Sequence, residues 1–164
     1  MIEVTVAQLG VDRTNNTPVV ILQEKDGKRV LPIWIGPTEA SAIAMELAGV
    51  KFARPLTHDL VKQIIVGLAA NLTRVIITQV KDNTYYAELH LHRDDHVIHV
   101  DARPSDSIAV ALRLQAPIFT EEGLLGEPID TVEPMQPPPD DMDPESLKSR
   151  LEKMGPEDFG KFTP

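Results

Sequence analysis

Two kinds of hydrophobic spacing follow one another along the first 126 residues of the chain. Short segments rich in apolar and β-branched residues, typical of β-strands, cover residues 2–10, 18–24, 30–36, 74–80, 85–92 and 97–101. Polar turns separate several of them, among them KDGKR before residue 30 and RDDH after residue 92. We therefore expect two groups of three strands, joined in part by hairpins.

Three further segments have the spacing of amphipathic helices. The first begins at Gly36 and Pro37 and ends at Gly49, the second follows Thr57 as N-cap, and the third follows Ser105 as N-cap. The side chains expected to face the core are Ala40, Ile43, Ala44 and Leu47 in the first helix, Leu60, Ile64 and Leu68 in the second, and Ile108, Ala109 and Leu112 in the third. A short strand at residues 116–119 closes the pattern.

Strands in groups with helices between them predict an α+β fold, with a mixed, mostly antiparallel sheet and three main helices packed on it. The length of 164 residues and the apolar fraction of 42% are enough for one such domain. The composition changes near Gly126, where GEPIDTVEPMQPPPDDMDPE is acidic and rich in proline. We therefore expect a domain at residues 1–126 and, at residues 127–164, an acidic Pro-rich linker with a short helix near residues 143–154.

The chain has no cysteine, which excludes disulfides and thiolate metal sites. It shows no secretory signal pattern and no apolar run of membrane-spanning length, so we expect a soluble, cytoplasmic protein with no membrane partner. The net charge of -9 is unfavourable for nucleic acid binding, which depends on Lys and Arg. Most of this charge belongs to the tail, since residues 1–126 carry 12 Lys and Arg against 15 Asp and Glu.

The sequence DARPSD, at residues 101–106, joins an expected strand to an expected helix and carries three charged side chains. One interpretation is structural: Ser105 caps the helix and Asp106 complements its positive N-terminus, each contributing about 0.3–2 kcal/mol. In the functional interpretation, Asp101 and Asp106 hold a divalent cation or activate water, while Arg103 stabilises a phosphoryl oxygen. The spacing alone leaves both interpretations open.

A second corner with the same Ala-Arg-Pro sequence, ARPLTHD, lies at residues 53–59. If the two corners face one another, Arg54, Arg103 and His58 form a pocket with the neighbouring acids, and His58 exchanges protons near neutral pH. The alternative for His58 is a solvated residue in the first turn of a helix. Glu39 and Asp59 also stand in first turns, where a carboxylate complements the helix dipole without any catalytic role.

Two further features carry weaker signals. Pairing the strands on either side of RDDH sets His90 against His99, and sets Glu88 against Asp101. Imidazoles and carboxylates on one sheet face resemble a metal site, although a register shift of one residue would separate them. Trp34 is the single tryptophan, and we expect it to pack against a helix or a second subunit rather than to stack on a nucleotide base.

Three motifs, in this order along the chain, resemble the bifunctional nuclease domain family. They are LPIWIGPTEASAIA at residues 31–44, RPLTHDL at residues 54–60, and DARPSDSIAVALR followed by APIF within residues 101–119. The resemblance covers residues 1–126 and implies a compact α+β domain that forms a wedge-shaped dimer with a large groove and degrades both DNA and RNA. It also implies candidate groove residues, namely Glu39, Arg54, His58, Asp59, Asp101, Arg103, Ser105 and Asp106.

The leading hypothesis is therefore a metal-assisted nuclease that acts on DNA and RNA in a groove of a homodimer. Its assigned catalytic residues are Asp101, Arg103, Asp106, His58, Asp59, Arg54 and Glu39. Asp101 and Asp106 would hold a divalent cation, Mg²⁺ or Mn²⁺, and His58 would carry the proton. The alternative is a non-catalytic dimeric module that binds a protein or a nucleic acid and whose Arg-Pro corners are structural.

Overall fold

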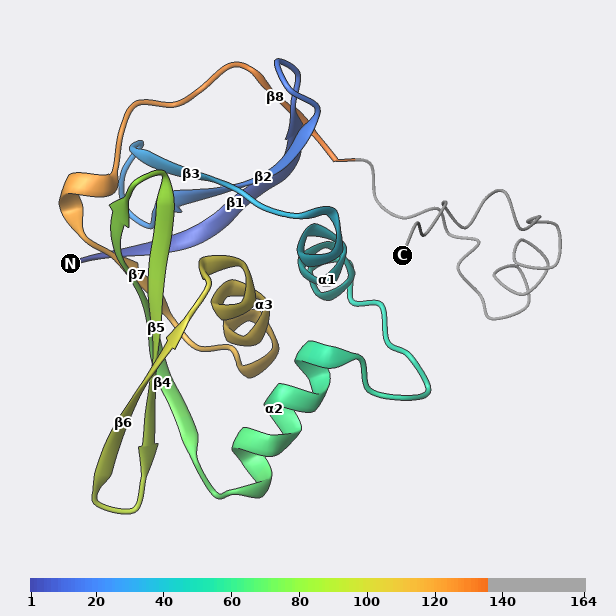
Figure 1. The fold of residues 1–164 in the computed structure, drawn as a ribbon, viewed down its shortest axis with the longest axis vertical. Helices are drawn as coiled ribbons and strands as arrows, with labels where there is room; N and C mark the ends of the chain where they lie inside the picture. Colours follow the sequence, from blue (N-terminus) through green and yellow to red (C-terminus); the bar gives the residue numbers. More distant parts are fainter. Residues whose placement is uncertain (136–164) are drawn as a thin grey trace, which may run out of the picture.

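The computed structural model describes residues 1–135, and the helix expected near residues 143–154 lies outside them (Figure 1). In chain order, the elements are β1 (Ile2–Asp12), β2 (Thr17–Glu24), β3 (Val30–Trp34), α1 (Pro37–Leu47), α2 (Thr57–Gly67), β4 (Asn71–Lys81), β5 (Thr84–Arg93), β6 (His96–Ala102), α3 (Pro104–Leu114), β7 (Ile118–Thr120), the 3₁₀ helix η1 (Glu122–Leu124) and β8 (Val132–Pro134). The predicted α+β class is confirmed.

All strands of the described residues belong to one sheet with the order β3-β2-β1-β7-β4-β5-β6, and β8 pairs with β1. Every pairing is antiparallel except that of β7 with β4. The short strand β7 pairs with β1 on one side and with β4 on the other, so it joins the two expected groups of three strands into one sheet. The prediction of a mixed, mostly antiparallel sheet is thus confirmed.

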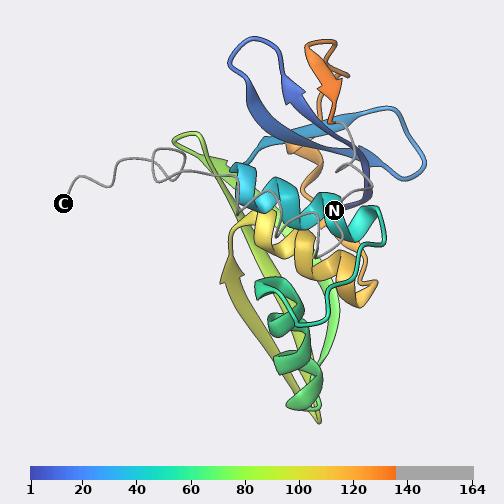
Figure 2. The same ribbon diagram turned by 90° about the vertical axis from the view of Figure 1, so that its right-hand side faces the viewer.

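The three helices lie together on one side of the twisted sheet, with α1 and α3 side by side and α2 beyond them toward the β5–β6 turn (Figure 2). The core lies between this helical layer and the sheet. Ala40 and Ile43 of α1, and Ile108 and Ala109 of α3, are buried there as predicted. Leu47 is instead 49% exposed at the end of α1, just before Gly49 adopts the left-handed conformation (φ 70°) that ends the helix.

The predicted orientation of α2 is wrong. Leu60 and Ile64 are each 50% exposed and Leu68 is 55% exposed, whereas Ile65 is buried and Val61 packs against the core. The helix covers the narrow end of the sheet and makes only a small contact with it. The side of α2 that carries Val61 and Ile65 is enough to form this contact. An apolar stripe therefore remains on the outside of α2.

Both predicted N-cap residues are also wrong by one or two positions. The N-cap of α3 is Arg103 rather than Ser105, because Pro104 occupies the first helical position, where its fixed φ fits and its missing N–H is not needed. The N-cap of α2 is Leu56 rather than Thr57. The backbone N–H of Leu56 donates to the Asp59 carboxylate (3.0 Å), so an acidic side chain of the first turn holds the helix start.

Strand pairing continues beyond the expected domain boundary at residue 126, since β8 pairs with β1. Ile129 and Val132 also pack against a second cluster of buried residues, Val19, Ile21 and Val30. Within residues 1–135, no helix combines the length and the apolar character needed to cross a bilayer.

Candidate functional site

The two Arg-Pro corners lie side by side in the folded chain and open into one pocket. Its volume is about 740 Å³, and it lies where the first turns of α1, α2 and α3 meet. The lining residues are Pro37, Thr38, Glu39, Ser41, Ala42, Met45, Pro55, Leu56, Thr57, His58, Arg103 and Asp106. Four of the seven candidate catalytic residues are therefore in one place.

Asp106 is the residue that connects the corners. It lies in the first turn of α3, and its Oδ1 is 2.9 Å from Nε2 of His58, in the first turn of α2. Its other oxygen accepts a hydrogen bond from Nε of Arg103 at 2.8 Å. The His58 side chain is only 13% exposed, so this contact fixes an imidazole at the wall of the pocket.

Arg103 extends the network to α1. A terminal guanidinium nitrogen lies 2.9 Å from Oε1 of Glu39, whose side chain is 18% exposed, while Arg103 itself is 65% exposed. Gly36 leaves room for the Glu39 carboxylate, because a Cβ at that position would displace it. In the sequence Gly36 indicates only a helix start, and its proximity to Glu39 becomes visible only in three dimensions.

The charges in the pocket influence one another. Burial alone would raise the pKa of the Asp106 carboxyl, but the hydrogen bonds from Arg103 and His58 outweigh it and lower that pKa below its ordinary value. Asp106 and Glu39 in turn raise the pKa of the Arg103 guanidinium. Asp106 is thus an anion at neutral pH, held between two hydrogen-bonding side chains.

Asp59 lies outside the pocket lining and has a different partner. Its Oδ1 accepts a hydrogen bond from Nε of Arg113 at 2.7 Å. Burial alone would raise the pKa of Asp59. The hydrogen bonds from Arg113 and from the Leu56 N–H have the larger effect, so the pKa lies below its ordinary value. In this position Asp59 stabilises the packing of α2 on α3.

The sequence did not single out Arg113, because charged residues are normally exposed. Its side chain is 4% exposed and also donates to the carbonyl oxygens of Ala109 and Ala42. One guanidinium thereby ties α1, α2 and α3 together behind the pocket. The available signal was spacing, since Arg113 follows the buried Ala109 by four residues and shares its helix face.

The remaining two candidates, Arg54 and Asp101, do not line this pocket. Arg54 is exposed and makes no ion pair with a residue of the described part. Asp101 is exposed on β6, opposite Glu88 of β5. Because Asp101 is outside the pocket and both Asp106 oxygens already accept hydrogen bonds, the pocket residues do not fit the expected cation site shared by this pair.

A smaller hollow of about 250 Å³ shares Arg103 with the main pocket and is also lined by Trp34, Asn83 and Tyr85. Trp34 is 42% exposed, so no helix of the described residues buries it, and its expected packing against a second subunit stays a prediction. Its indole N–H donates to Asp12 at 2.9 Å, which fixes the orientation of the ring. An aromatic surface therefore adjoins the guanidinium.

The arginines are not concentrated in the pocket. Its lining contains two acids, Glu39 and Asp106, against one arginine, Arg103, and one histidine. Binding of a polyanion there would depend on local hydrogen bonds rather than on a strongly positive field.

The family model described as "Bifunctional nuclease domain" matches residues 20–130, a range that contains the whole pocket. An uncharacterized protein of Mycobacterium tuberculosis is 42% identical over 162 residues, covering 96% of this chain and 97% of that protein. Two proteins of Oryza sativa subsp. japonica, named Bifunctional nuclease 1 and Bifunctional nuclease 2, are 30% and 32% identical over 105 and 122 residues. These matches cover 60% and 71% of this chain but only 31% and 38% of the rice proteins.

Proposed function

Because the chain belongs to the bifunctional nuclease domain family, we propose that it hydrolyses phosphodiester bonds of DNA and RNA in the pocket between its Arg-Pro corners. The observation that supports this site is the double contact of Asp106 with His58 and Arg103 at the wall of an open pocket. It combines a proton carrier with a phosphate ligand, the two functions that a phosphodiesterase requires.

In the proposed reaction, His58 is the general base. Asp106 occupies its Nε2 and fixes the ring, which leaves Nδ1 to accept a proton from a water molecule. The water oxygen attacks phosphorus, and the bond from phosphorus to the leaving oxygen breaks. The protonated imidazole then gives its proton to that oxygen, so His58 returns to its starting state. Asp106 stabilises the transient positive charge on the ring, because its lowered pKa keeps it anionic.

Arg103 has the complementary role in this proposal. Its side chain is 65% exposed, and its contacts with Glu39 and Asp106 use one terminal nitrogen and Nε, so the other terminal nitrogen can donate to a phosphoryl oxygen. The planar fork of N–H groups suits a phosphate better than an ammonium does. Trp34, at the edge of the adjoining hollow, offers a surface on which a neighbouring base of a single strand can stack.

The test is turnover of labelled single-stranded DNA and RNA by the purified full chain, with and without Mg²⁺ or Mn²⁺. We expect His58→Gln and Asp106→Asn each to reduce the rate by about 100-fold or more. His96→Gln, which changes an exposed histidine at the start of β6, is the matched control and should leave the rate unchanged. Equal rates in wild type, His58→Gln and Asp106→Asn would contradict the proposed site.

One observation favours the alternative of a non-catalytic module. Each carboxylate of the pocket is already paired with Arg103, as expected for a corner whose role is structural. The same variants separate the two functions. A structural corner predicts that Asp106→Asn lowers the free energy of unfolding without changing any residual nucleolytic rate per folded molecule, whereas the nuclease proposal predicts loss of the rate.

We also propose that the chain acts as a dimer that uses the outer stripe of α2. Leu60, Ile64 and Leu68 are at least half exposed and follow one another at intervals of four residues, so they form one apolar surface. A contiguous exposed apolar surface of this kind is typical of an interface. A second copy of the chain offers a matching stripe, as a two-fold interface requires.

A further inference from the structure

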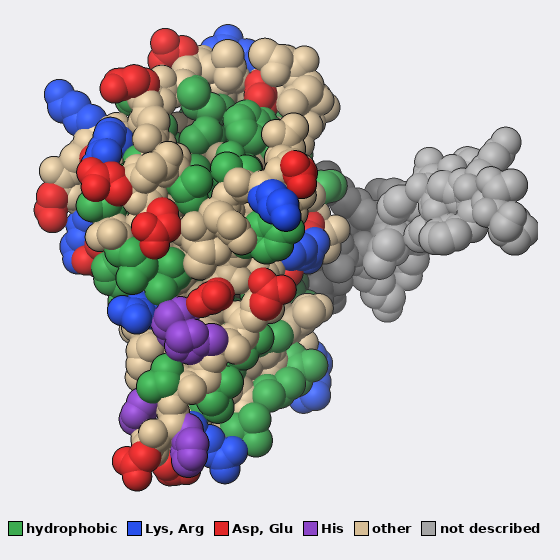
Figure 3. Space-filling view, turned by 60° about the vertical axis from the view of Figure 1, so that its left-hand side comes forward, with side chains coloured by type: hydrophobic (Ala, Val, Ile, Leu, Met, Phe, Trp, Pro, Cys, Tyr) green, Lys and Arg blue, Asp and Glu red, His purple; other side chains and the backbone are tan. Residues whose placement is uncertain are grey.

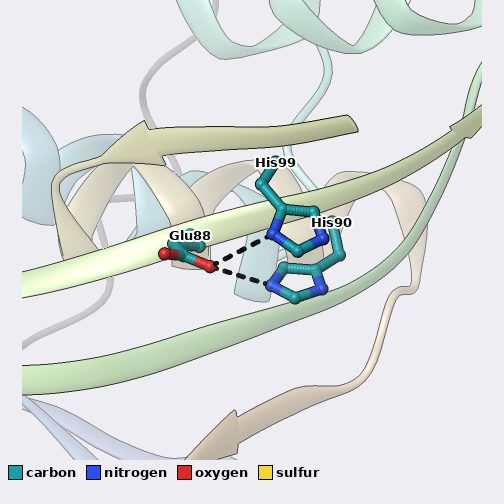
Figure 4. Close-up of side chains that lie close together, drawn as sticks. All are labelled: Glu88, His90 and His99. Carbon is teal, nitrogen blue, oxygen red and sulfur yellow. Dashed lines mark hydrogen bonds and ion pairs between the residues drawn. The ribbon is translucent and has the colours of Figure 1, made fainter. Parts of the chain in front are cut away.

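We propose that Glu88, His90 and His99 bind a transition-metal ion of the zinc type on the β5–β6 hairpin (Figure 4). One ligand atom from each side chain lies within 4.8 Å of the other two, and no other group of three or more such side chains among residues 1–135 meets this condition. None of the three residues lines the pocket between the Arg-Pro corners. The proposed site is therefore independent of the proposed nuclease function.

The two strands hold the three side chains in place. Glu88 and His90 are two residues apart on β5, so both point to the same face of the sheet. His99 is paired directly with His90 in the antiparallel register of β5 and β6, and so it projects from that face as well. The opposite face of β5 carries Ala87 and Leu89 in the core, which fixes the strand against rotation.

The site combines a buried anchor with accessible partners. The His90 side chain is 7% exposed, whereas those of Glu88 and His99 are 40% and 55% exposed. Figure 3 shows histidine side chains beside acidic ones on one face of the molecule. An ion can therefore enter from solvent, and the exposed ligands can adjust around the fixed one.

The donor atoms are close together, because both imidazoles have the same Glu88 oxygen as a neighbour. Nε2 of His90 is 3.0 Å from Oε2 of Glu88, and Nδ1 of His99 is 3.8 Å from the same oxygen. The two imidazole rings stack with their centroids 4.0 Å apart. Because the stacked ring planes are nearly parallel, His99 must turn out of the stack to direct its nitrogen at an ion held by His90. Reorientation of the exposed Glu88 and His99 side chains would then bring all three donors to about 2.0–2.2 Å from one ion, the distances found for zinc.

Charge also favours a cation here. Asp101 lies directly opposite Glu88 in the β5–β6 register, so two carboxylates stand on this face, and like charges so placed repel each other. A divalent ion bound by Glu88 would reduce this repulsion.

The donor set selects the class of ion. Imidazole nitrogens suit Zn²⁺ and its neighbours in the first transition series, whereas Mg²⁺ and Ca²⁺ require oxygen ligands. Two histidines and one glutamate fill three positions of a tetrahedron and leave the fourth to water.

Arg74 of β4 opposes binding at this site. Its Nε donates to Nδ1 of His90 at 3.4 Å, which assigns the ring proton to Nε2, facing Glu88. When Nε2 binds a metal ion, the proton must move to Nδ1, and the guanidinium must turn away. The structure thus predicts that removal of the Arg74 N–H and charge strengthens metal binding.

The experiment is calorimetric titration of the untagged full chain with Zn²⁺, and separately with Mg²⁺, at about pH 7.5, where histidines are largely unprotonated. We expect one equivalent of Zn²⁺ to bind and Mg²⁺ not to bind. His99→Gln and Glu88→Gln should each weaken Zn²⁺ binding at least about tenfold, while Arg74→Gln should strengthen it about tenfold. His96→Gln, on the same hairpin but outside the cluster, is the control and should match wild type.

Three results would overturn the proposal: no uptake of Zn²⁺, equal affinity in wild type, His99→Gln and Glu88→Gln, or an equal loss in His96→Gln. His90→Gln changes a buried side chain and tests folding as much as binding. The role of His90 is therefore tested in the wild-type chain, by NMR of the imidazole nitrogens. The signals of His90 and His99 should shift on addition of Zn²⁺, and that of His96 should not.

Discussion

At the scale of single residues, Asp106 makes the free energy of unfolding depend on pH. Burial would raise the pKa of its carboxyl, and the bonds from Arg103 and His58 lower it overall. A carboxyl with a lower pKa in the folded state stabilises the fold above its unfolded pKa of about 3.9, and this contribution is lost as the pH falls through the folded-state pKa. The free energy of unfolding should therefore fall less steeply below about pH 4 in Asp106→Asn than in wild type.

Urea unfolding from about pH 6 to about pH 2 measures this slope. Asp26→Asn, a change at an exposed turn residue, serves as the control for removing one carboxylate. The same slope in Asp106→Asn and in wild type would mean that the hydrogen bonds of Asp106 do not persist in solution.

Single residues also show what the sequence allows one to predict. Glu39, His58, Arg103 and Asp106 were candidates because charged side chains at helix starts next to proline stand out in the sequence. Their pairing was not predictable, since His58 and Asp106 are 48 positions apart and only the packing of α2 on α3 brings them together. Arg113 was missed because a hydrophobicity pattern does not show a buried cation that finds its partners on other helices.

At the scale of elements, Arg113 supports a prediction about how the helices are held together. Asp59→Asn removes the carboxylate that lies 2.7 Å from a guanidinium that is 4% exposed. Only the more distant Glu46, at 3.9 Å, and two carbonyl oxygens would remain as partners. We expect a loss of roughly 3 kcal/mol in the free energy of unfolding, because a buried charge without its partner is costly.

Chemical denaturation of Asp59→Asn measures that loss. Lys51→Ala is the matched control, since the Lys51–Glu46 pair also joins two charges near α1 but has a lysine that is 70% exposed. It should cost less than about 1 kcal/mol. Equal costs in the two variants would show that burial of Arg113 has no energetic consequence.

The elements differ in how well local rules determine them. The register of β5 with β6, including His90 opposite His99, follows from a short turn and strict alternation, and it is found as expected. The orientation of α2 does not follow from its apolar residues, because they occupy more than one face and the sequence does not show which face the sheet covers. The N-cap of α3 was misplaced because proline at the first helical position has priority over the capping tendency of serine. That of α2 was misplaced because the Asp59 carboxylate, rather than the Thr57 hydroxyl, accepts a backbone N–H at the helix start.

At the scale of the whole molecule, the three-residue strand β7 determines how the two groups of strands and the helices are arranged. It inserts between β1 and β4, far from both in sequence, and contributes the parallel pairing with β4. This places α3, which precedes β7, against α1 and α2 in the middle of the helical layer. The pocket between the Arg-Pro corners depends on this arrangement of the helices. Each motif can be recognised from its local sequence, whereas the position of one motif relative to the other depends on strand pairings between distant segments.

The outer stripe of α2 predicts a dimer in solution. The stripe of Leu60, Ile64 and Leu68 leaves a large apolar surface in water, and a second copy would bury it at a gain of about 25 cal/mol per Å². Sedimentation velocity of the full chain should give twice the chain mass of 18.1 kDa. Leu60→Glu should give the monomer mass with unchanged circular dichroism, because a charge cannot be buried there without a partner.

Val80→Glu is the control for that experiment, since Val80 is also an exposed apolar residue (44%) but belongs to β4 and lies outside the stripe. A monomeric wild type, or a Leu60→Glu variant that remains a dimer, would contradict the α2 interface. The pocket residues belong to one chain, so a monomeric Leu60→Glu variant also tests whether the proposed nuclease site needs the partner. Retention of the full rate by this monomer would show that dimer formation contributes to substrate binding or stability rather than to the chemical step.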